Sequence, residues 1–165
     1  MTIRPLREED WEEVVALERR AYAASGFSEG EEALRSRHRA SPSTCFVLEY
    51  EGAFGGYLLA LPYPLGRCPD LSSLEQGPAA PGTNLHAHDL VIAERLRGRG
   101  LASRMLRHLE EAGRTAGHRT LSLVDVHGAP GAWSALGYRP RPGTPLPASY
   151  GPHAVYMAQE LDAPH

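Results

Sequence analysis

The sequence predicts an α/β protein in which helices cover both faces of one mixed β-sheet. Short apolar runs typical of strands are interspersed with segments of helical periodicity, in the order β-α-α-β-β-β-α-β-α-β-β. The chain has 165 residues, of which 42% are hydrophobic. This size and composition suit one globular domain over residues 1–165 with a sizeable core.

The first half of the chain is predicted to hold a strand, two helices and a hairpin. A helix over 8–24 is expected because apolar residues recur at helical spacing, namely Trp11, Val14, Val15, Ala21 and Tyr22. Ser28-Glu29-Gly30-Glu31 has the pattern of a capping box and predicts a second helix that ends near Arg39. The expected strands lie at 2–6, 45–50 and 54–61, the last two joined as a hairpin by Glu51-Gly52-Ala53.

The second half begins with a long irregular segment. Residues 62–84 are rich in proline, glycine and serine without periodicity, which is typical of a lid or binding segment. A strand at 85–93 precedes a helix that runs from Gly98 or Arg99 to Ala116 and is capped by Gly117. The remaining elements expected are a strand at 120–126, a short helix at 130–136, a strand from Tyr138, a second proline-rich loop at 139–152 and a strand at 154–161.

Composition excludes several classes of function. The formal charge of −3 gives no general attraction to nucleic acid. No stretch approaches the roughly 20 apolar residues that span a bilayer, and no secretory signal follows Met1. Two cysteines, Cys45 and Cys68, are too few for a disulfide framework, so a reduced, cytoplasmic protein is expected. Lysine is absent, which excludes a Walker-type phosphate loop and a Schiff-base lysine.

The segment Arg97-Gly98-Arg99-Gly100-Leu101-Ala102 lies between a predicted strand and a predicted helix. A helix N-terminus leaves N–H groups unpaired, glycines permit close approach and unusual dihedral angles, and arginines pair with phosphate oxygens. The segment therefore predicts an anion site. An ordinary turn is one alternative. Another is a dinucleotide fingerprint with Asp125 on a ribose, but Ser103 replaces its third glycine and the motif follows the fourth strand.

Residues 85–138 resemble the core of the GNAT acetyltransferases. The loop fits their Arg/Gln-x-x-Gly-x-Gly/Ala signature, Asp89-Leu90-Val91-Ile92 is similar to their fourth strand, and Trp133-Ser134-Ala135-Leu136-Gly137-Tyr138 to their aromatic-x-x-x-Gly-aromatic ending. The resemblance implies about seven strands in a mixed, mainly antiparallel sheet, flanked by about four helices. It implies acetyl-coenzyme A as co-substrate. The implied cofactor-binding residues are Leu90, Val91 and Ile92 for pantetheine, and Arg97, Gly98, Arg99, Gly100, Leu101, Ala102 and Ser103 for the pyrophosphate, with the N–H of Ile92 polarising the thioester carbonyl.

His86 and His88 are the candidate bases, because an attacking amine must lose a proton near neutral pH. A strand with period 2 places both imidazoles on one face and Asp89 on the opposite face, where a structural role is expected. The pair most resembles the arylalkylamine N-acetyltransferases, which have histidines at both positions, whereas the histone-type enzymes have a glutamate in place of His86. A packed, hydrogen-bonded pair is the alternative. No metal site is expected, because no ligand set has a recognisable spacing.

Trp133 departs from the family pattern, in which a tyrosine protonates the leaving thiolate. The indole N–H has no accessible acidity. Coenzyme A can leave as thiolate with only a hydrogen bond, since thiols have a pKa near 8.5, or Tyr138, Tyr150 or Ser134 supplies the proton. Trp133 is then expected to pack against the pantetheine or acetyl group.

The acceptor is expected to be a small primary amine, of the arylalkyl kind or another. Glu29, Glu31 and Glu32 gather near the first inter-helix turn, where they attract a cation or complement the helix dipole. The candidate aromatic wall consists of Tyr22, Phe27, Tyr63 and Tyr150. Peptide N-termini and antibiotic amines are alternatives. A non-catalytic acyl-coenzyme A-binding module and a nicotinamide-binding oxidoreductase are the rival functions, and a monomer or homodimer is expected.

Overall fold

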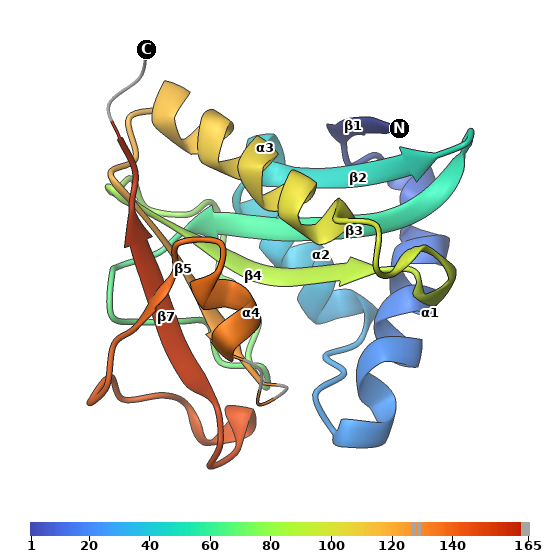
Figure 1. Cartoon of the computed structure of the whole chain (residues 1–165). Coiled ribbons are helices and arrows are strands. Elements are labelled where there is room, and N and C mark those ends of the chain that lie inside the picture. Colours follow the sequence, from blue (N-terminus) through green and yellow to red (C-terminus); the bar gives the residue numbers. More distant parts are fainter. Residues whose placement is uncertain (127, 129, 163–165) are drawn as a thin grey trace.

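The computed structural model describes residues 1–126, 128 and 130–162. One seven-stranded sheet has the order β1-β2-β3-β4-β5-β7-β6 (Figure 1). The strands are β1 (Thr2–Pro5), β2 (Cys45–Tyr50), β3 (Ala53–Pro62), β4 (Asn84–Ile92), β5 (Thr120–Asp125), β6 (Arg139–Pro140) and β7 (Val155–Glu160). The helices are α1 (Trp11–Tyr22), α2 (Glu31–Ala40), α3 (Leu101–Thr115) and α4 (Pro130–Ser134). The predicted number and order of strands and helices are confirmed.

Helices cover both faces of the sheet. In Figure 1, α2 lies behind the sheet, where it contacts β3, and α3 lies in front of it and contacts β4. The helix α1 packs against α2, β3 and β4. The main core lies between these layers, and the largest fully buried apolar side chains in it are Leu34, Leu48, Leu58, Leu59, Leu85, Met105, Leu106 and Leu109. Neighbouring strands are antiparallel except β4 and β5, which are parallel.

The helix α3 forms where the glycine loop ends. Its predicted apolar side is confirmed, because Leu101, Met105, Leu106 and Leu109 are buried against the sheet. Gly117 follows the helix with φ +89° and donates its N–H to the carbonyl of Arg114 at 3.0 Å. Burial of this apolar face fixes the N-terminus of α3 beside the end of β4.

The start of α2 differs from the prediction. The helix begins at Glu31 with Gly30 as its cap, and no side chain caps it. The Ser28 hydroxyl instead donates to the carboxylate of Glu18 on α1, at 2.6 Å. The predicted capping box is therefore wrong, because a buried carboxylate from another helix offers Ser28 a stronger, charge-assisted partner.

No helix in the described part of the chain has the length and apolar character needed to cross a bilayer.

A close approach of β3 and β4 requires glycine at position 56. A Cβ atom added to Gly56 would lie 2.7 Å from the carbonyl oxygen of Val91 and 3.3 Å from the Cα of Ile92. We expect Gly56→Ala to lower the free energy of unfolding by about 1–3 kcal/mol, because backbone atoms must shift. Gly82→Ala is the matched control, since its Cβ would meet nothing within 4 Å. Urea denaturation compares the two, and equal stabilities would contradict the expectation.

Candidate functional site

The sheet opens between β4 and β5. In the described residues the two strands pair only over Asn84–Thr120, Leu85–Leu121 and His86–Ser122. Beyond this point β4 continues to Ile92 and β5 to Asp125, but the two strands no longer pair with each other. Figure 1 shows β5 and β7 turned away from β4. One backbone edge of residues 87–92 is therefore open to an extended ligand that pairs with it as a strand would.

The predicted anion loop lies at the end of this cleft. Gly98 and Gly100 have φ +80° and φ +72°, a conformation that favours glycine. The first hydrogen bond of α3 runs from the N–H of Arg104 to the carbonyl of Gly100, at 3.2 Å. The N–H groups of the helix's first residues, 101–103, precede that bond and have no acceptor within the helix. The loop therefore presents the donors that the sequence analysis expected for a pyrophosphate.

The arginines of the loop are exposed. Arg97 and Arg99 both reach solvent, and the Arg99 guanidinium lies over the Tyr50 ring, 5.5 Å from its centroid. No Cβ clash explains the glycines, since an atom added at Gly98 or Gly100 would meet nothing within 4 Å. The dihedral angles are thus the reason for both glycines, and the space above them is open.

A cavity of about 60 Å³ lies within the cleft. It is lined by Tyr22, Ala87, His88, Leu90, Leu106, Leu123, Val124, Asp125, Val126 and Trp133. The Trp133 indole N–H donates to Asp125 Oδ1 at 3.2 Å. The cavity thus brings together two of the predicted cofactor-binding residues, Leu90 and Trp133. Val91 and Ile92 are buried in the core on the same strand.

The imidazole of His86 is almost fully buried, with 1% of the residue exposed. Its Nδ1 shares a hydrogen bond with the Ser122 hydroxyl at 2.8 Å, and its ring stacks on Tyr156 with centroids 6.2 Å apart. Burial, together with the positive charges of Arg37 and of His88 when protonated, lowers the pKa of His86 to about 3. The ring is therefore neutral at physiological pH and is a poor base there, contrary to the unperturbed pKa assumed from sequence.

His88 lies at an irregularity of β4. The register passes from Leu59↔Asp89 to Ala60↔Ala87, which leaves His88 as the extra residue of a β-bulge. Its ring centroid lies 6.2 Å from that of His86, so the predicted proximity of the two imidazoles is confirmed. The His88 Nε2 atom lies 2.8 Å from Glu29 Oε2, and both side chains are buried.

The bulge changes the position of Asp89. Its side chain lies on the same side of the sheet as His88, and both line a second cavity of about 40 Å³. The prediction that Asp89 points to the opposite face is therefore wrong, because the extra residue interrupts the two-residue period. Burial and the charge of Glu29 raise the pKa of Asp89 to about 7.

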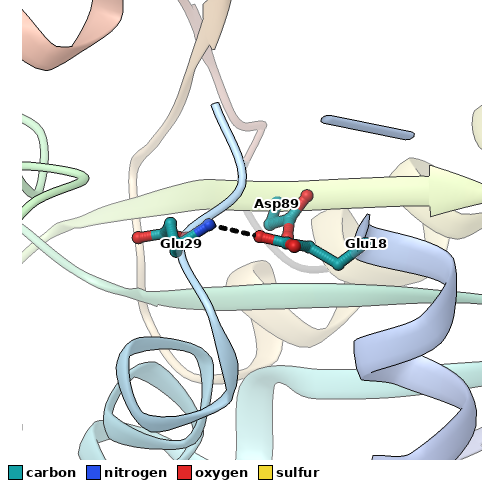
Figure 2. Close-up of side chains that lie close together, drawn as sticks. All are labelled: Glu18, Glu29 and Asp89. Carbon is teal, nitrogen blue, oxygen red and sulfur yellow. Dashed lines mark hydrogen bonds between the residues drawn. The ribbon is translucent and has the colours of Figure 1, made fainter. Parts of the chain in front are cut away.

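Two carboxylates that the sequence did not predict lie beside Asp89. Figure 2 shows Glu18 from α1, Glu29 from the segment before α2 and Asp89 from β4 close together, with the backbone N–H of Glu29 directed at the Glu18 carboxylate. One oxygen of each lies within 4.8 Å of the others. In the sequence, Glu29 is one of several acidic residues near a predicted turn, and no local pattern distinguishes Glu18. The group is a set that can hold a cation, which the sequence spacing did not predict.

Each of the two proline-rich loops contributes a residue to the wall of the 40 Å³ cavity, Leu71 from the first and Tyr150 from the second. Arg37 of α2, with 1% of the residue exposed, donates to Glu75 at 2.8 Å and to the carbonyls of Asp70 and Ser73 at 2.9 and 2.8 Å. The Tyr150 hydroxyl donates to the carbonyl of Pro69 at 2.6 Å, which joins the second loop to the first. These bonds join the first loop to α2 and the two loops to each other.

The aromatic candidates divide between the site and the core. Tyr22, Phe27 and Tyr150 line the 40 Å³ cavity, and the Tyr63 ring lies 6.4 Å from that of His86. Tyr138 instead belongs to the main core, and it is not among the described residues that line either cavity. Burial raises the pKa of Tyr138 far above its usual value. Its role as a proton donor stays a prediction.

The raised pKa of Asp89 predicts a pH-dependent effect of Asp89→Asn on stability. The carboxyl titrates near pH 7 when folded and near its ordinary value of 3.8 when unfolded. Between these values the folded protein binds more protons there, so wild-type stability falls as pH rises. We expect the free energy of unfolding of the variant minus that of the wild type to increase from about pH 4 to about pH 7, by up to about 4 kcal/mol, and then to level off.

Denaturant titrations at a series of pH values measure this difference. Asp162→Asn, at an exposed position, is the control and should show no trend. A difference for Asp89→Asn that stays flat or decreases with pH would contradict the buried, protonated carboxyl.

Comparison with known proteins adds a family match. The sequence profile described as the acetyltransferase (GNAT) family matches residues 11–138. A search of curated proteins finds no match to the chain.

Solved structures match over nearly the whole chain. The GphF GNAT-like decarboxylase in complex with isobutyryl-CoA is 20% identical with a TM-score of 0.80, over 98% of this chain and 100% of that one. The ribosomal-protein-S18-alanine N-acetyltransferase from Escherichia coli is 19% identical with a TM-score of 0.70, over 99% and 96%. An aminoglycoside 6'-N-acetyltransferase complexed with coenzyme A is 15% identical with a TM-score of 0.71, over 100% and 99%. At these low identities, the TM-scores show a shared fold.

Proposed function

Because the chain belongs to the acetyltransferase (GNAT) family, we propose that it acetylates the primary amine of a small molecule by direct attack of that amine. Family membership makes the chain an acyl-coenzyme A-dependent acetyltransferase, with acetyl-coenzyme A as co-substrate. The proposal also includes the identity of the acceptor and the residues that move protons. We further propose that the protein is cytoplasmic and is a monomer or a homodimer.

The cleft and the glycine loop fit the coenzyme. The open edge of β4 would hold the pantetheine through the backbone of Leu90 to Ile92, and the loop of residues 97–102, helped by Ser103, would hold the pyrophosphate. Acetyl-coenzyme A supplies an activated thioester carbonyl for the amine. The cavity beside Leu90 and Trp133 is the space for this reacting end, and its apolar lining of Ala87, Leu106 and Leu123 excludes water.

His88 is the base in this proposal, and its pairing with Glu29 is the observation that supports the proposal most. The hydrogen bond between Nε2 and the Glu29 carboxylate favours the tautomer with the proton on Nε2. The lone pair of Nδ1 is then available, and Nδ1 is buried without a hydrogen-bond partner among the described residues. Nδ1 can take the proton of the amine, after which Glu29 stabilises the imidazolium. His86, which stays neutral, lies beside it and helps to define the pocket.

A non-catalytic acyl-coenzyme A-binding module is the rival, motivated by Trp133 in place of tyrosine. A decarboxylase is a second candidate, since the GNAT-like decarboxylase has the TM-score of 0.80. Its substrate would carry a carboxylate on the acyl group. Three carboxylates at the far end of the cleft repel such a group and attract an amine, so the charge of the site favours acetyl transfer.

The proposal is tested by release of coenzyme A thiol from acetyl-coenzyme A, followed with a thiol reagent. We expect turnover with at least one class in a panel of 2-phenylethylamine, butylamine, an aminoglycoside and a peptide with a free N-terminus. Malonyl-coenzyme A should lose no carbon dioxide. If no amine gives turnover while calorimetry shows tight coenzyme binding, the binding module is supported instead. NAD(H) binding that acetyl-coenzyme A cannot displace would support an oxidoreductase.

The two histidines are expected to differ in the pH dependence of kcat/KM. His88→Gln keeps an N–H donor for Glu29 but removes the base, so we expect kcat to fall by about 10²–10⁴-fold and the rise of kcat/KM near neutral pH to disappear. His86→Asn should keep that rise, because a pKa of about 3 leaves His86 neutral throughout the range. His153→Gln, at an exposed position, is the control. A wild-type profile for His88→Gln would show that another group is the base.

A further inference from the structure

The carboxylates of Glu18, Glu29 and Asp89 form a second feature of the site, which we call the acidic cluster. It lies behind the sheet, on the side opposite α3, and its three members come from different elements (Figure 2). All three line the 40 Å³ cavity that also contains Tyr22 and His88. Since Tyr22 and His88 line the neighbouring 60 Å³ cavity as well, the acidic cluster adjoins the space where the thioester is expected to lie.

Two of the carboxylates already accept hydrogen bonds at both oxygens. Glu18 accepts from the Ser28 hydroxyl at 2.6 Å and from the backbone N–H of Glu29 at 2.7 Å. The Glu29 carboxylate accepts from Arg37 at 2.7 Å and lies 2.8 Å from Nε2 of His88. These contacts hold both carboxylates fixed at the wall of the cavity.

Asp89 is different, because only one of its oxygens is used. Its Oδ2 accepts from the Tyr57 hydroxyl at 2.7 Å, and the Tyr22 hydroxyl is a second hydrogen-bond partner of this carboxyl. Its Oδ1 is buried and accepts no hydrogen bond from the residues that the structure describes. The Nδ1 atom of His88 is likewise buried and has no hydrogen-bond partner among the described residues. Two buried acceptors on the wall of one cavity, without a donor, indicate a ligand that brings N–H groups.

The charges around the cavity agree with a cationic ligand. Arg37 forms an ion pair with Glu29 and a second ion pair with Glu75. Glu18, Glu29 and Asp89 therefore exceed the fixed positive charge beside them when all are ionised. A buried negative charge that lacks a counter-ion is unfavourable, and a bound cation relieves it.

We propose that the acidic cluster is the acceptor-binding site, where a primary ammonium group on a slender chain donates to Asp89 Oδ1. This inference rests on the proposed amine acetylation and names the acceptor class. The ammonium gives one proton to His88 Nδ1, and the lone pair that is left on its nitrogen attacks the thioester carbonyl to form the C–N bond. The C–S bond then breaks, coenzyme A leaves as thiolate, and the second proton of the nitrogen passes to that thiolate to give the neutral amide and the thiol. The cavity, with a volume of about 40 Å³, favours an acceptor whose amine stands at the end of a slender, unbranched chain.

A divalent metal ion is the alternative ligand of such a cluster. Calcium takes about six to eight oxygen ligands and magnesium about six in octahedral geometry. Asp89 Oδ1 is the single carboxylate oxygen of the three residues without a hydrogen-bond donor in the described structure. An ammonium needs fewer acceptors than a metal ion, and it also supplies a proton for His88, so it fits the available atoms better.

Calorimetry on the full chain saturated with free coenzyme A tests the inference. The probes are 2-phenylethylamine and 2-phenylethanol, which differ in the ammonium group. We expect the wild type and the control Asp162→Asn to bind the amine at least about tenfold more tightly than the alcohol, and Asp89→Asn to reduce this preference to less than about threefold. Asp89→Asn retains an oxygen for Tyr57, and circular dichroism checks its fold. In turnover, the variant should raise the KM for the amine and leave that for acetyl-coenzyme A unchanged.

The outcomes separate this inference from the proposed function. Turnover of amines by the wild type, with an unchanged amine KM in Asp89→Asn, would overturn the acceptor site and leave acetyl transfer in place. Absence of turnover with every amine would remove the proposed function, and equal binding of amine and alcohol would then remove the acceptor site as well. Calorimetric titration with Mg²⁺, Ca²⁺, Mn²⁺ or Zn²⁺ alone tests whether the acidic cluster binds a divalent metal ion. Metal binding that Asp89→Asn abolishes, without an effect on amine binding, would replace the ammonium with a metal ion.

Discussion

The divergence of β4 from β5 is the constraint on which the rest of the site depends. Pairing stops after His86 and Ser122, and both strands continue beyond these residues. An unpaired strand edge inside a protein is unfavourable unless a partner satisfies it. Here the opening joins the front of the sheet, with the glycine loop, to the back, with the acidic cluster. A coenzyme that enters from one face can thus meet an amine that enters from the other.

The bulge at His88 connects that opening to the acid–base chemistry. An extra residue in β4 turns Asp89 toward the same cavity as His88, so the proposed base and a carboxylate occur side by side on one strand. In a regular strand the two side chains would lie on opposite faces. The Glu29 carboxylate then fixes the tautomer of His88 from another part of the chain. The reactive geometry thus comes from one local irregularity and one contact over 59 residues.

These two contributions explain what the sequence could predict. The glycine loop, α3 and the proximity of the two histidines follow from local patterns, because dihedral angles, helical periodicity and strand period depend on neighbouring residues. The position of Asp89 could not be predicted, since no residue pattern marks the bulge. The recruitment of Glu18 depends on tertiary packing of α1 against the segment before α2, and the same packing takes Ser28 away from the predicted capping box. The low pKa of His86 likewise follows from burial that sequence does not reveal.

In the proposed reaction, more ionisable groups lie near the attacking amine than near the leaving thiol. The amine side has His88, Glu29 and Asp89, all buried and close together. On the thiol side, Trp133 donates its indole N–H to Asp125, and Tyr138 lies in the core with its pKa raised by burial. A thiol with a pKa near 8.5 is a good leaving group without a proton donor, whereas an ammonium cannot attack at all until it loses a proton. In the proposed reaction the ionisable groups thus lie on the side that needs a proton transfer, and a tryptophan at position 133 is compatible with catalysis.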